Sequence, residues 1–150
     1  MNLQTALSQL EKHIQDVPQH FNQFSPEVLL SRPAPGKWSK QEILGHLIDS
    51  AINNLKRFTD TQCFPQPYTV IRYQQDDLVI INRYQQLLLE HLLELWSILN
   101  KQIINIISTI PADKLPYTVI IPSGESKTLE WLAIDYVEHM EHHLKQIFGS

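Results

Sequence analysis

Apolar residues recur at steps of three and four along several stretches of the chain, which is the spacing of one helical face. The first stretch covers residues 3–17, and its helix is expected to end before Pro18, because proline cannot donate the next helical hydrogen bond. The second begins near Lys40, where Ser39 and Glu42 have the spacing of a capping box. These two signals predict two amphipathic helices in the first 60 residues.

Two further amphipathic stretches follow in the second half of the chain. One runs from residue 76 or 77 to Pro111 and predicts a single helix of roughly 45 Å at 1.5 Å per residue. The other is capped by Ser126 or Thr128 and reaches Phe148. Residues 60–75 contain two prolines and predict an irregular connection, whereas residues 116–126 are β-branched and predict a short extended segment.

Four long amphipathic helices predict an all-α fold, most simply a four-helix bundle. A length of 150 residues is near the usual size of one compact domain, so we expect residues 1–150 to form a single domain. Because 43% of the residues are apolar, the chain can bury a hydrophobic core.

The charge and composition exclude several classes of partner. Sixteen acidic residues against twelve basic ones give a net charge of -4, so nucleic acid is not an expected partner. Charged and polar residues interrupt every apolar stretch, and the first residues do not resemble a secretion signal, which predicts a cytoplasmic protein without a membrane span. Cys63 is the only cysteine, so neither an intrachain disulfide nor a thiolate metal site is expected.

Three histidines near the end of the chain suggest metal chemistry. His139 and His143 are four residues apart on one predicted helix and can converge on one ion, while His142 points elsewhere. A third ligand must come from another element, and His46 on the second predicted helix is the best candidate. The simpler alternative is that the C-terminal pair lies on the surface and complements the helix dipole.

His46 begins a polar line that continues with Ser50, Asn53 and Arg57 at steps of four, three and four. If the second and fourth predicted helices are neighbours, this line would face a cleft beside the histidine pair. From the pattern alone, the solvated side of an amphipathic helix remains the simpler interpretation.

Two motifs carry a resemblance to a known family. W-S-x-x-E-x-x-x-H-L-x-D-S spans residues 38–50, and H-x-x-H-H-x-x-Q-I spans residues 139–147. With these motifs in this order, most of the chain resembles the DinB/YfiT-like superfamily and is similar to its YfiT branch of metal-dependent hydrolases. The resemblance implies a four-helix bundle with zinc or nickel held by His46, His139 and His143, and it leaves His142 as an accessory or surface residue.

The resemblance also implies enzymatic chemistry, because relatives include thiol-dependent transferases and an isomerase that use low-molecular-weight thiols such as bacillithiol or mycothiol. A divalent metal on neutral imidazoles can activate water or a thiol, which predicts a hydrolase or an S-transferase acting on a small-molecule substrate. We interpret Asp49 as a proton acceptor, and Asn53 and Arg57 as groups that orient an anionic part of the substrate or cofactor. Glu42 or Asp135 could hold a ligand histidine in place.

Two other functions stay open. One is a non-catalytic, stress-related bundle in which the metal only pins two helices together, and the other is a plain helical dimerisation protein without metal. A fourth protein ligand would favour the structural metal site, because three histidines leave a coordination position for chemistry. Many relatives form dimers, so a homodimer is also an expectation.

Overall fold

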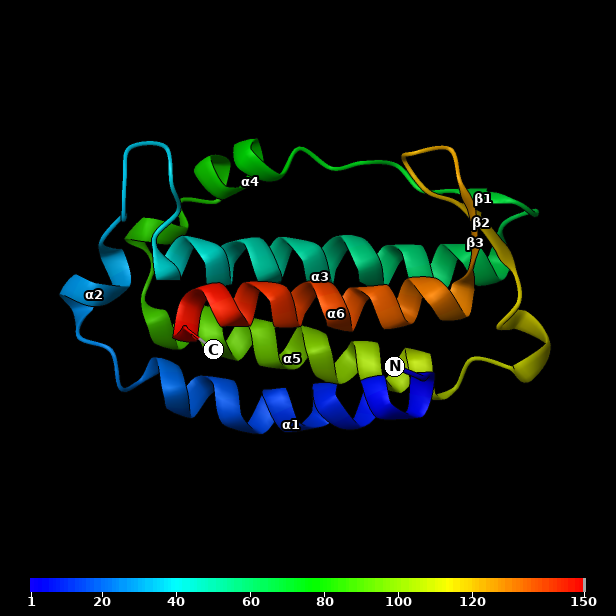
Figure 1. Ribbon diagram of the computed structural model, residues 1–150, viewed down its shortest axis with the longest axis horizontal. Helices are drawn as coiled ribbons and strands as arrows, with labels where there is room; N and C mark the ends of the chain where they lie inside the picture. Colours follow the sequence, from blue (N-terminus) through cyan, green and yellow to red (C-terminus); the bar gives the residue numbers. More distant parts are fainter. Residues whose placement is uncertain (150) are drawn as a thin grey trace.

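Four long helices lie side by side in the computed structural model, which describes residues 1–149 (Figure 1). They are α1 (Leu3–Phe21), α3 (Lys40–Cys63), α5 (Leu89–Ser108) and α6 (Leu129–Phe148). Their apolar faces meet in one core, in which the Trp96, Phe21 and Phe58 side chains are fully buried. The predicted four-helix bundle is therefore confirmed.

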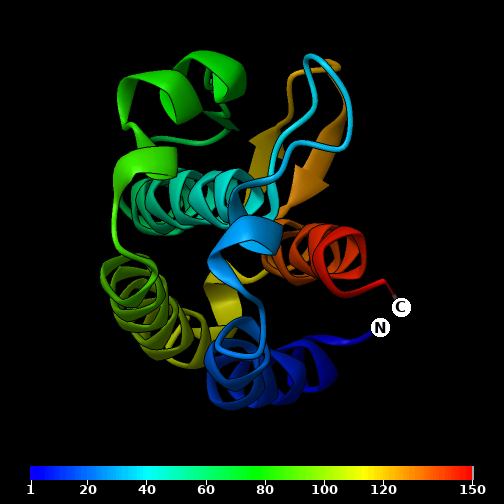
Figure 2. The ribbon, with the colours of Figure 1, turned by 90° about the vertical axis from the view of Figure 1, so that its left-hand side faces the viewer.

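The helices form a ring in which α3 lies opposite α1, and α5 lies opposite α6 (Figure 2). Helices α3 and α5 run in the same direction along the bundle, because the chain between them returns over the outside of α3 (Figure 1). Helix α6 runs antiparallel to α3 and packs beside it. The first turns of α3 therefore lie next to the last turns of α6.

Short elements lie at the two ends of the bundle and over the outside of α3 (Figure 1). Helix α2 (Pro26–Leu30) begins after its cap Ser25, α4 (Gln75–Ile81) and the 3-10 turn η1 (Tyr84–Gln86) lie outside α3, and the 3-10 turn η2 (Ala112–Lys114) follows α5. Strands β1 (Tyr68–Thr69), β2 (Thr118–Ile120) and β3 (Ser126–Thr128) form a small sheet in the order β1-β2-β3, with β1 parallel and β3 antiparallel to β2. The extended segment predicted at residues 116–126 is confirmed. Among the helices of residues 1–149, none has the length and apolar character needed to cross a membrane.

The predicted end of the first helix before Pro18 is wrong, because α1 continues to Phe21. The Phe21 side chain is fully buried and makes edge-on contacts with the rings of Phe24 and Phe148, at centroid distances of 6.0 and 5.2 Å. A proline inside a helix removes one hydrogen bond. Burying a whole aromatic side chain offsets that loss, so the helix passes through the proline.

The single helix predicted from residue 76 or 77 to Pro111 is also wrong. Helix α4 ends at Ile81, Arg83 adopts a left-handed conformation with φ of 54°, and α5 begins only at Leu89. The break is stabilised by Tyr84, whose ring lies so close to Gly45 that a Cβ there would be 2.1 Å from it. Apolar periodicity missed the break because α4 and α5 carry the same period.

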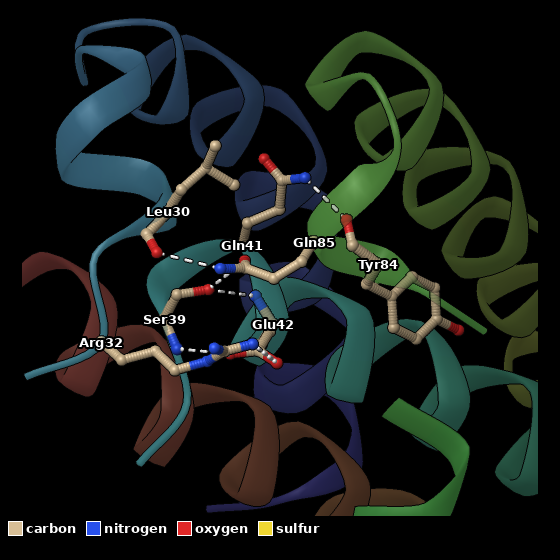
Figure 3. A network of polar contacts seen from close by, with 7 residues as sticks. All are labelled: Leu30, Arg32, Ser39, Gln41, Glu42, Tyr84 and Gln85. Carbon is tan, nitrogen blue, oxygen red and sulfur yellow. Dashed lines mark hydrogen bonds and ion pairs between the residues drawn. The ribbon is translucent and has the colours of Figure 1, made fainter. Parts of the chain in front are cut away.

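The start of α3 is fixed by the capping box that the sequence predicts. The Ser39 hydroxyl accepts from the Glu42 backbone N–H, and the Glu42 carboxylate accepts from the Ser39 N–H. Figure 3 shows this pair at the centre of a polar network, in which Arg32 forms an ion pair with Glu42 at 2.8 Å and the Ser39 hydroxyl donates to Gln85 at 2.6 Å. The first turn of α3, which precedes the turn that carries His46, is thereby held by Arg32 and Gln85.

Candidate metal centre

Helices α3 and α6 bring three histidines together at one end of the bundle. One ring nitrogen from each of His46, His139 and His143 lies within 4.8 Å of the others. The ring centroid of His46 lies 5.4 Å from that of His139 and 4.6 Å from that of His143. The Nε2 atoms of His139 and His143 are 3.2 Å apart. These are the three side chains that the sequence singled out.

The convergence follows from how the two helices are anchored. Consecutive turns of α6 place His139 and His143 on one face. Helix α6 is capped at its start by Thr128, whose hydroxyl accepts from Trp131 N–H at 3.0 Å, and near its end the Lys40 ammonium donates to the Ile147 carbonyl. This last contact ties the end of α6 to the start of α3, so the pair faces His46.

His46 is fully buried, and neither of its ring nitrogens has a hydrogen-bond partner among the described residues. The Trp38 ring covers it at a centroid distance of 4.8 Å. Buried polar atoms without a partner are rare, because each costs about 1–3 kcal/mol. A cation bound by the imidazole lone pair would satisfy one of the two nitrogens, so the donor set fits a divalent metal. The interpretation of His46 as part of a solvated face is wrong.

The environment keeps these imidazoles neutral, which is the form that binds metal. Burial lowers the pKa of His46 to about 3, with further lowering by His143 and His139. Burial also lowers the pKa of His139 to about 4, and it lowers the pKa of His143. Three neutral nitrogens without a fourth His, Cys, Asp or Glu in their group, among residues 1–149, can leave coordination positions for other molecules.

The residues around the cluster differ from the expectation. The Nδ1 atom of His143 contacts Gln146 Oε1 at 2.8 Å, so a glutamine one turn away orients this ring. Glu42 does not hold a histidine, because its carboxylate is occupied by Arg32 and Ser39 (Figure 3). For Asp135, no hydrogen bond to a histidine is present within residues 1–149. His142 is exposed and lies outside the cluster, as expected.

The polar line on α3 is only partly exposed. Ser50 is buried, whereas Asn53 and Arg57 are partly buried. The Asn53 amide donates to the Asp49 carbonyl at 2.8 Å, and the Arg57 guanidinium donates to the Ile71 carbonyl at 2.7 Å. The solvated interpretation therefore does not describe this face of α3, which is covered by the segment before α4.

Asp49 is buried on the flank of this line. Its Oδ1 atom accepts from the Tyr84 hydroxyl at 2.6 Å and from the Asn82 amide at 3.3 Å, whereas Oδ2 has no partner among the described residues. Burial raises the pKa of Asp49 to about 6, although the hydrogen bond from Tyr84 lowers it. A carboxyl with this pKa can both hold and release a proton near neutral pH.

Sequence reasoning missed two aromatic walls of the site. Tyr73 lies 6.4 Å from His46 between ring centroids, and the Arg57 guanidinium lies over the Tyr73 ring at 5.3 Å. Trp38 lines a pocket of about 380 Å³ together with His143, Gln75 and Asp76. Tyr73 lies in the connection between two prolines, Pro65 and Pro67, and the start of α4. The only sign of its role in the sequence is that it is aromatic.

Comparisons with known proteins give the same fold. YfiT from Bacillus subtilis, described as a probable metal-dependent hydrolase with an unusual four-helix bundle topology, superposes with a TM-score of 0.87 at 20% identity, over 97% of this chain and 83% of that chain. The mycothiol-dependent maleylpyruvate isomerase superposes with a TM-score of 0.67 at 14% identity, over 96% of this chain but only 60% of that chain. At these identities the likeness shows the fold alone.

Sequence comparisons establish the family. No curated protein matches the chain significantly. The family model of the DinB superfamily matches residues 9–147, which include all three clustered histidines and the polar line on α3. The chain therefore belongs to the DinB superfamily.

Proposed function

We propose that the protein is a metal-dependent enzyme that acts on a small molecule, as a hydrolase or as a thiol-dependent S-transferase. His46, His139 and His143 would hold one divalent ion, zinc or nickel. The observation that carries the proposal is the convergence of three neutral imidazoles, two partly buried and one fully buried, in which the His46 nitrogens have no other partner among the described residues. Three nitrogen ligands are the donor set of an open catalytic site.

When bound, the ion supplies positive charge that activates a water or a thiol for attack on an electrophile. The chain's own residues then do the rest. Asp49 takes up the proton that the nucleophile releases, because its pKa lies near 6 and its Oδ2 is unpartnered. Gln146 holds the His143 ring, and Trp38 and Tyr73 limit the access of water to His46.

Two observations support the choice between reaction classes without deciding it. YfiT, which shares the fold, is described as a probable metal-dependent hydrolase, and this supports water as the nucleophile. The structurally similar isomerase is named for its dependence on mycothiol, and this supports a thiol. The competing function is a non-catalytic bundle with a structural metal, for which a fourth protein ligand would be expected.

The first experiment measures the metal content of protein purified without a metal affinity column, by elemental analysis. We expect about one divalent ion per chain in the wild type, and loss of the ion in the His46→Ala and His139→Ala variants. His142→Ala is the matched control, because His142 lies on the same turn but outside the cluster, and it should keep the ion. Loss of the ion in His142→Ala with retention in His143→Ala would overturn the ligand assignment.

The second experiment assigns the nucleophile. Electrophilic substrates such as alkylating agents and small esters are incubated with metal-loaded protein, with and without bacillithiol, glutathione or coenzyme A. Turnover that needs both metal and thiol identifies an S-transferase, whereas turnover that needs metal alone identifies a hydrolase. Equal rates in wild type and His46→Ala would show that the activity does not come from this site. Turnover in no arm, together with a fourth protein ligand in a metal-loaded crystal structure, would support the non-catalytic bundle.

A further inference from the structure

Arg57 is a partly buried cation without an ionic partner. Its guanidinium donates to the Ile71 carbonyl at 2.7 Å and to the Asn54 side-chain oxygen at 3.4 Å, and both acceptors are neutral. Within residues 1–149, the ion pairs involve other side chains, and none includes Arg57. Arginine is rarely buried unless it is paired, so this position calls for an explanation.

The guanidinium also has unused hydrogen-bonding capacity. It carries five N–H donors in a flat fork, and the two contacts above engage only part of that fork. The guanidinium carbon lies over the Tyr73 ring at 5.3 Å from its centroid, within the range of a cation–π contact. Such a fork can bind either a carboxylate or a phosphate through paired N–H donors, but a single guanidinium balances the one charge of a carboxylate and only part of the charge of about −1.5 to −2 on a phosphate monoester.

Arg57 lies on the same face of α3 as His46, because eleven residues are close to three helical turns. Arg57 and His46 are eleven residues apart on α3, roughly 16 Å along the helix axis at 1.5 Å per residue. Helical side chains lean toward the N-terminus of their helix, which for Arg57 is the end that holds His46. The Tyr73 ring centroid lies 5.3 Å from the guanidinium carbon and 6.4 Å from the His46 ring centroid, so Tyr73 is a neighbour of both groups.

Asp135 is the acidic group that acts on Arg57 from α6, but it does not neutralise it. Its charge raises the pKa of Arg57 less than burial lowers it, and the two side chains form no ion pair among the described residues. Burial and the neighbouring Glu138 raise the pKa of Asp135 itself. The positive charge of Arg57 therefore remains available to a ligand.

We propose that Arg57 binds a carboxylate group of the substrate, so that the substrates of this protein are small carboxylic acids whose reactive atom lies across the Tyr73 ring at the three histidines. The inference rests on the proposed function for the position of the reactive atom. It adds the chemical class of the substrate and a specificity residue that sets it. Tyr73 is the surface over which the substrate extends from one end of the site to the other.

The test is a titration of the full-length protein with acetate. The NMR resonance of the Arg57 Nε–H group is monitored at each acetate concentration. Acetate should shift this resonance saturably, whereas acetamide, which has the same shape without the charge, should not. Arg57→Gln should weaken acetate binding about tenfold or more, because a charge-assisted pair is lost. The Arg57→Gln variant lacks the Arg57 Nε–H group, so its acetate binding is measured from the indole N–H resonance of Trp38 and the backbone amide resonance of Tyr73.

The controls use other residues of the same surface. Arg72→Gln removes an exposed arginine of the covering segment and should leave acetate binding unchanged. Asp135→Asn removes the opposing charge and should tighten acetate binding. Arg57→Lys keeps the charge but not the fork, so it should bind acetate more weakly than the wild type and more tightly than Arg57→Gln. The inference would be overturned if wild type and Arg57→Gln bound acetate with equal affinity, or if acetate and acetamide gave equal shifts. The assignment to carboxylates would be overturned if inorganic phosphate bound more tightly than acetate.

The same titration separates this inference from the proposed function. It is run on metal-loaded wild type and on His46→Ala, whose metal content is measured beside it. Acetate binding at Arg57 in a wild-type protein that takes up no metal would support the carboxylate site and contradict the metalloenzyme. Metal uptake without acetate binding at Arg57 would support the metalloenzyme and contradict the carboxylate site.

Discussion

Replacing His46 by leucine should have opposite effects on stability in the presence and absence of metal. The His46 side chain is fully buried, and in the neutral ring one nitrogen is a donor and the other an acceptor, both without a partner among the described residues. Each unpartnered atom costs about 1–3 kcal/mol in the metal-free protein. Leucine has no polar atom to satisfy, and its misfit to the flat cavity costs about 1–3 kcal/mol.

These terms predict that metal-free His46→Leu is as stable as the metal-free wild type, or more stable by about 1–3 kcal/mol. With metal the order is reversed. An ion that binds only the folded wild type adds about 4.1 kcal/mol when its free concentration is 1,000 times its dissociation constant, which exceeds the advantage of the variant, and the variant cannot gain this increment. The wild type should therefore be the more stable protein once zinc is in excess over chelator.

Urea unfolding at pH 7.5 measures both states, once with a chelator and once with zinc buffered at a known free concentration. His142→Leu is the control, because this histidine lies on α6 next to the ligand His143 but is exposed and outside the cluster, so its replacement should leave the zinc increment intact. The reasoning would be refuted if metal-free His46→Leu were less stable than the wild type by about 2 kcal/mol or more. An unchanged zinc increment in the variant would refute the role of His46 as a ligand.

Three further predictions follow from the same region. Without metal, the free energy of unfolding should fall as the pH drops below about 6.5, because the unfolded chain protonates histidines that the folded state keeps neutral. The fall should be up to about 1.4 kcal/mol per pH unit for each proton taken up. Urea unfolding curves at pH 5 and pH 7.5 should therefore be closer together in His46→Leu than in the wild type. Asp49→Asn should become more stable relative to the wild type as the pH rises from 4 to 7, because the folded state holds the Asp49 proton up to about pH 6, and turnover by this variant should fall. Gly45→Ala should destabilise the protein in urea by about 1–3 kcal/mol, although alanine favours helices, because the new Cβ meets the Tyr84 ring.

Each of these has an outcome that would contradict it. Metal-free stability that is flat between pH 5 and 7.5 would show that the three imidazoles are not held neutral by burial. A stability difference between Asp49→Asn and the wild type that does not change with pH would show that Asp49 is ionised throughout. For Gly45→Ala, the second substitution Tyr84→Ala should remove the clash, so a double variant whose losses simply add would contradict the packing argument.

The parts of the fold that local chemistry determines were predictable. The capping box of Ser39 and Glu42 depends on residues three apart, and the structure has both of its hydrogen bonds. The passage of α1 through Pro18 was not predictable, because it depends on the contact of Phe21 with Phe148 at the other end of the chain. The break before α5 likewise depends on the fit of Tyr84 against Gly45, which no periodicity records.

The site shows the same division between local and distant causes. The spacing of His139 and His143 is a property of one helix, so the pair could be recognised from the sequence. The burial of His46 depends on Trp38 and Tyr73, which lie eight residues before it and 27 residues after it. Pattern alone therefore favoured a solvated face for a line of residues that a distant segment covers.

The burial of unpartnered polar groups on one helix is itself an argument for function. His46, Asp49 and Arg57 all lie on α3, and each keeps hydrogen-bonding capacity that the described residues do not satisfy. Each such group costs stability in the free protein, and a bundle selected only for stability would replace them with apolar residues. The three groups differ in what would satisfy them: a cation for the imidazole, a proton for the carboxylate and an anion for the guanidinium. A cation, a proton and an anion bound together would satisfy all three groups and lower the free energy of the bound state. The stability that the free protein loses at these groups would then contribute to the affinity and the selectivity of binding.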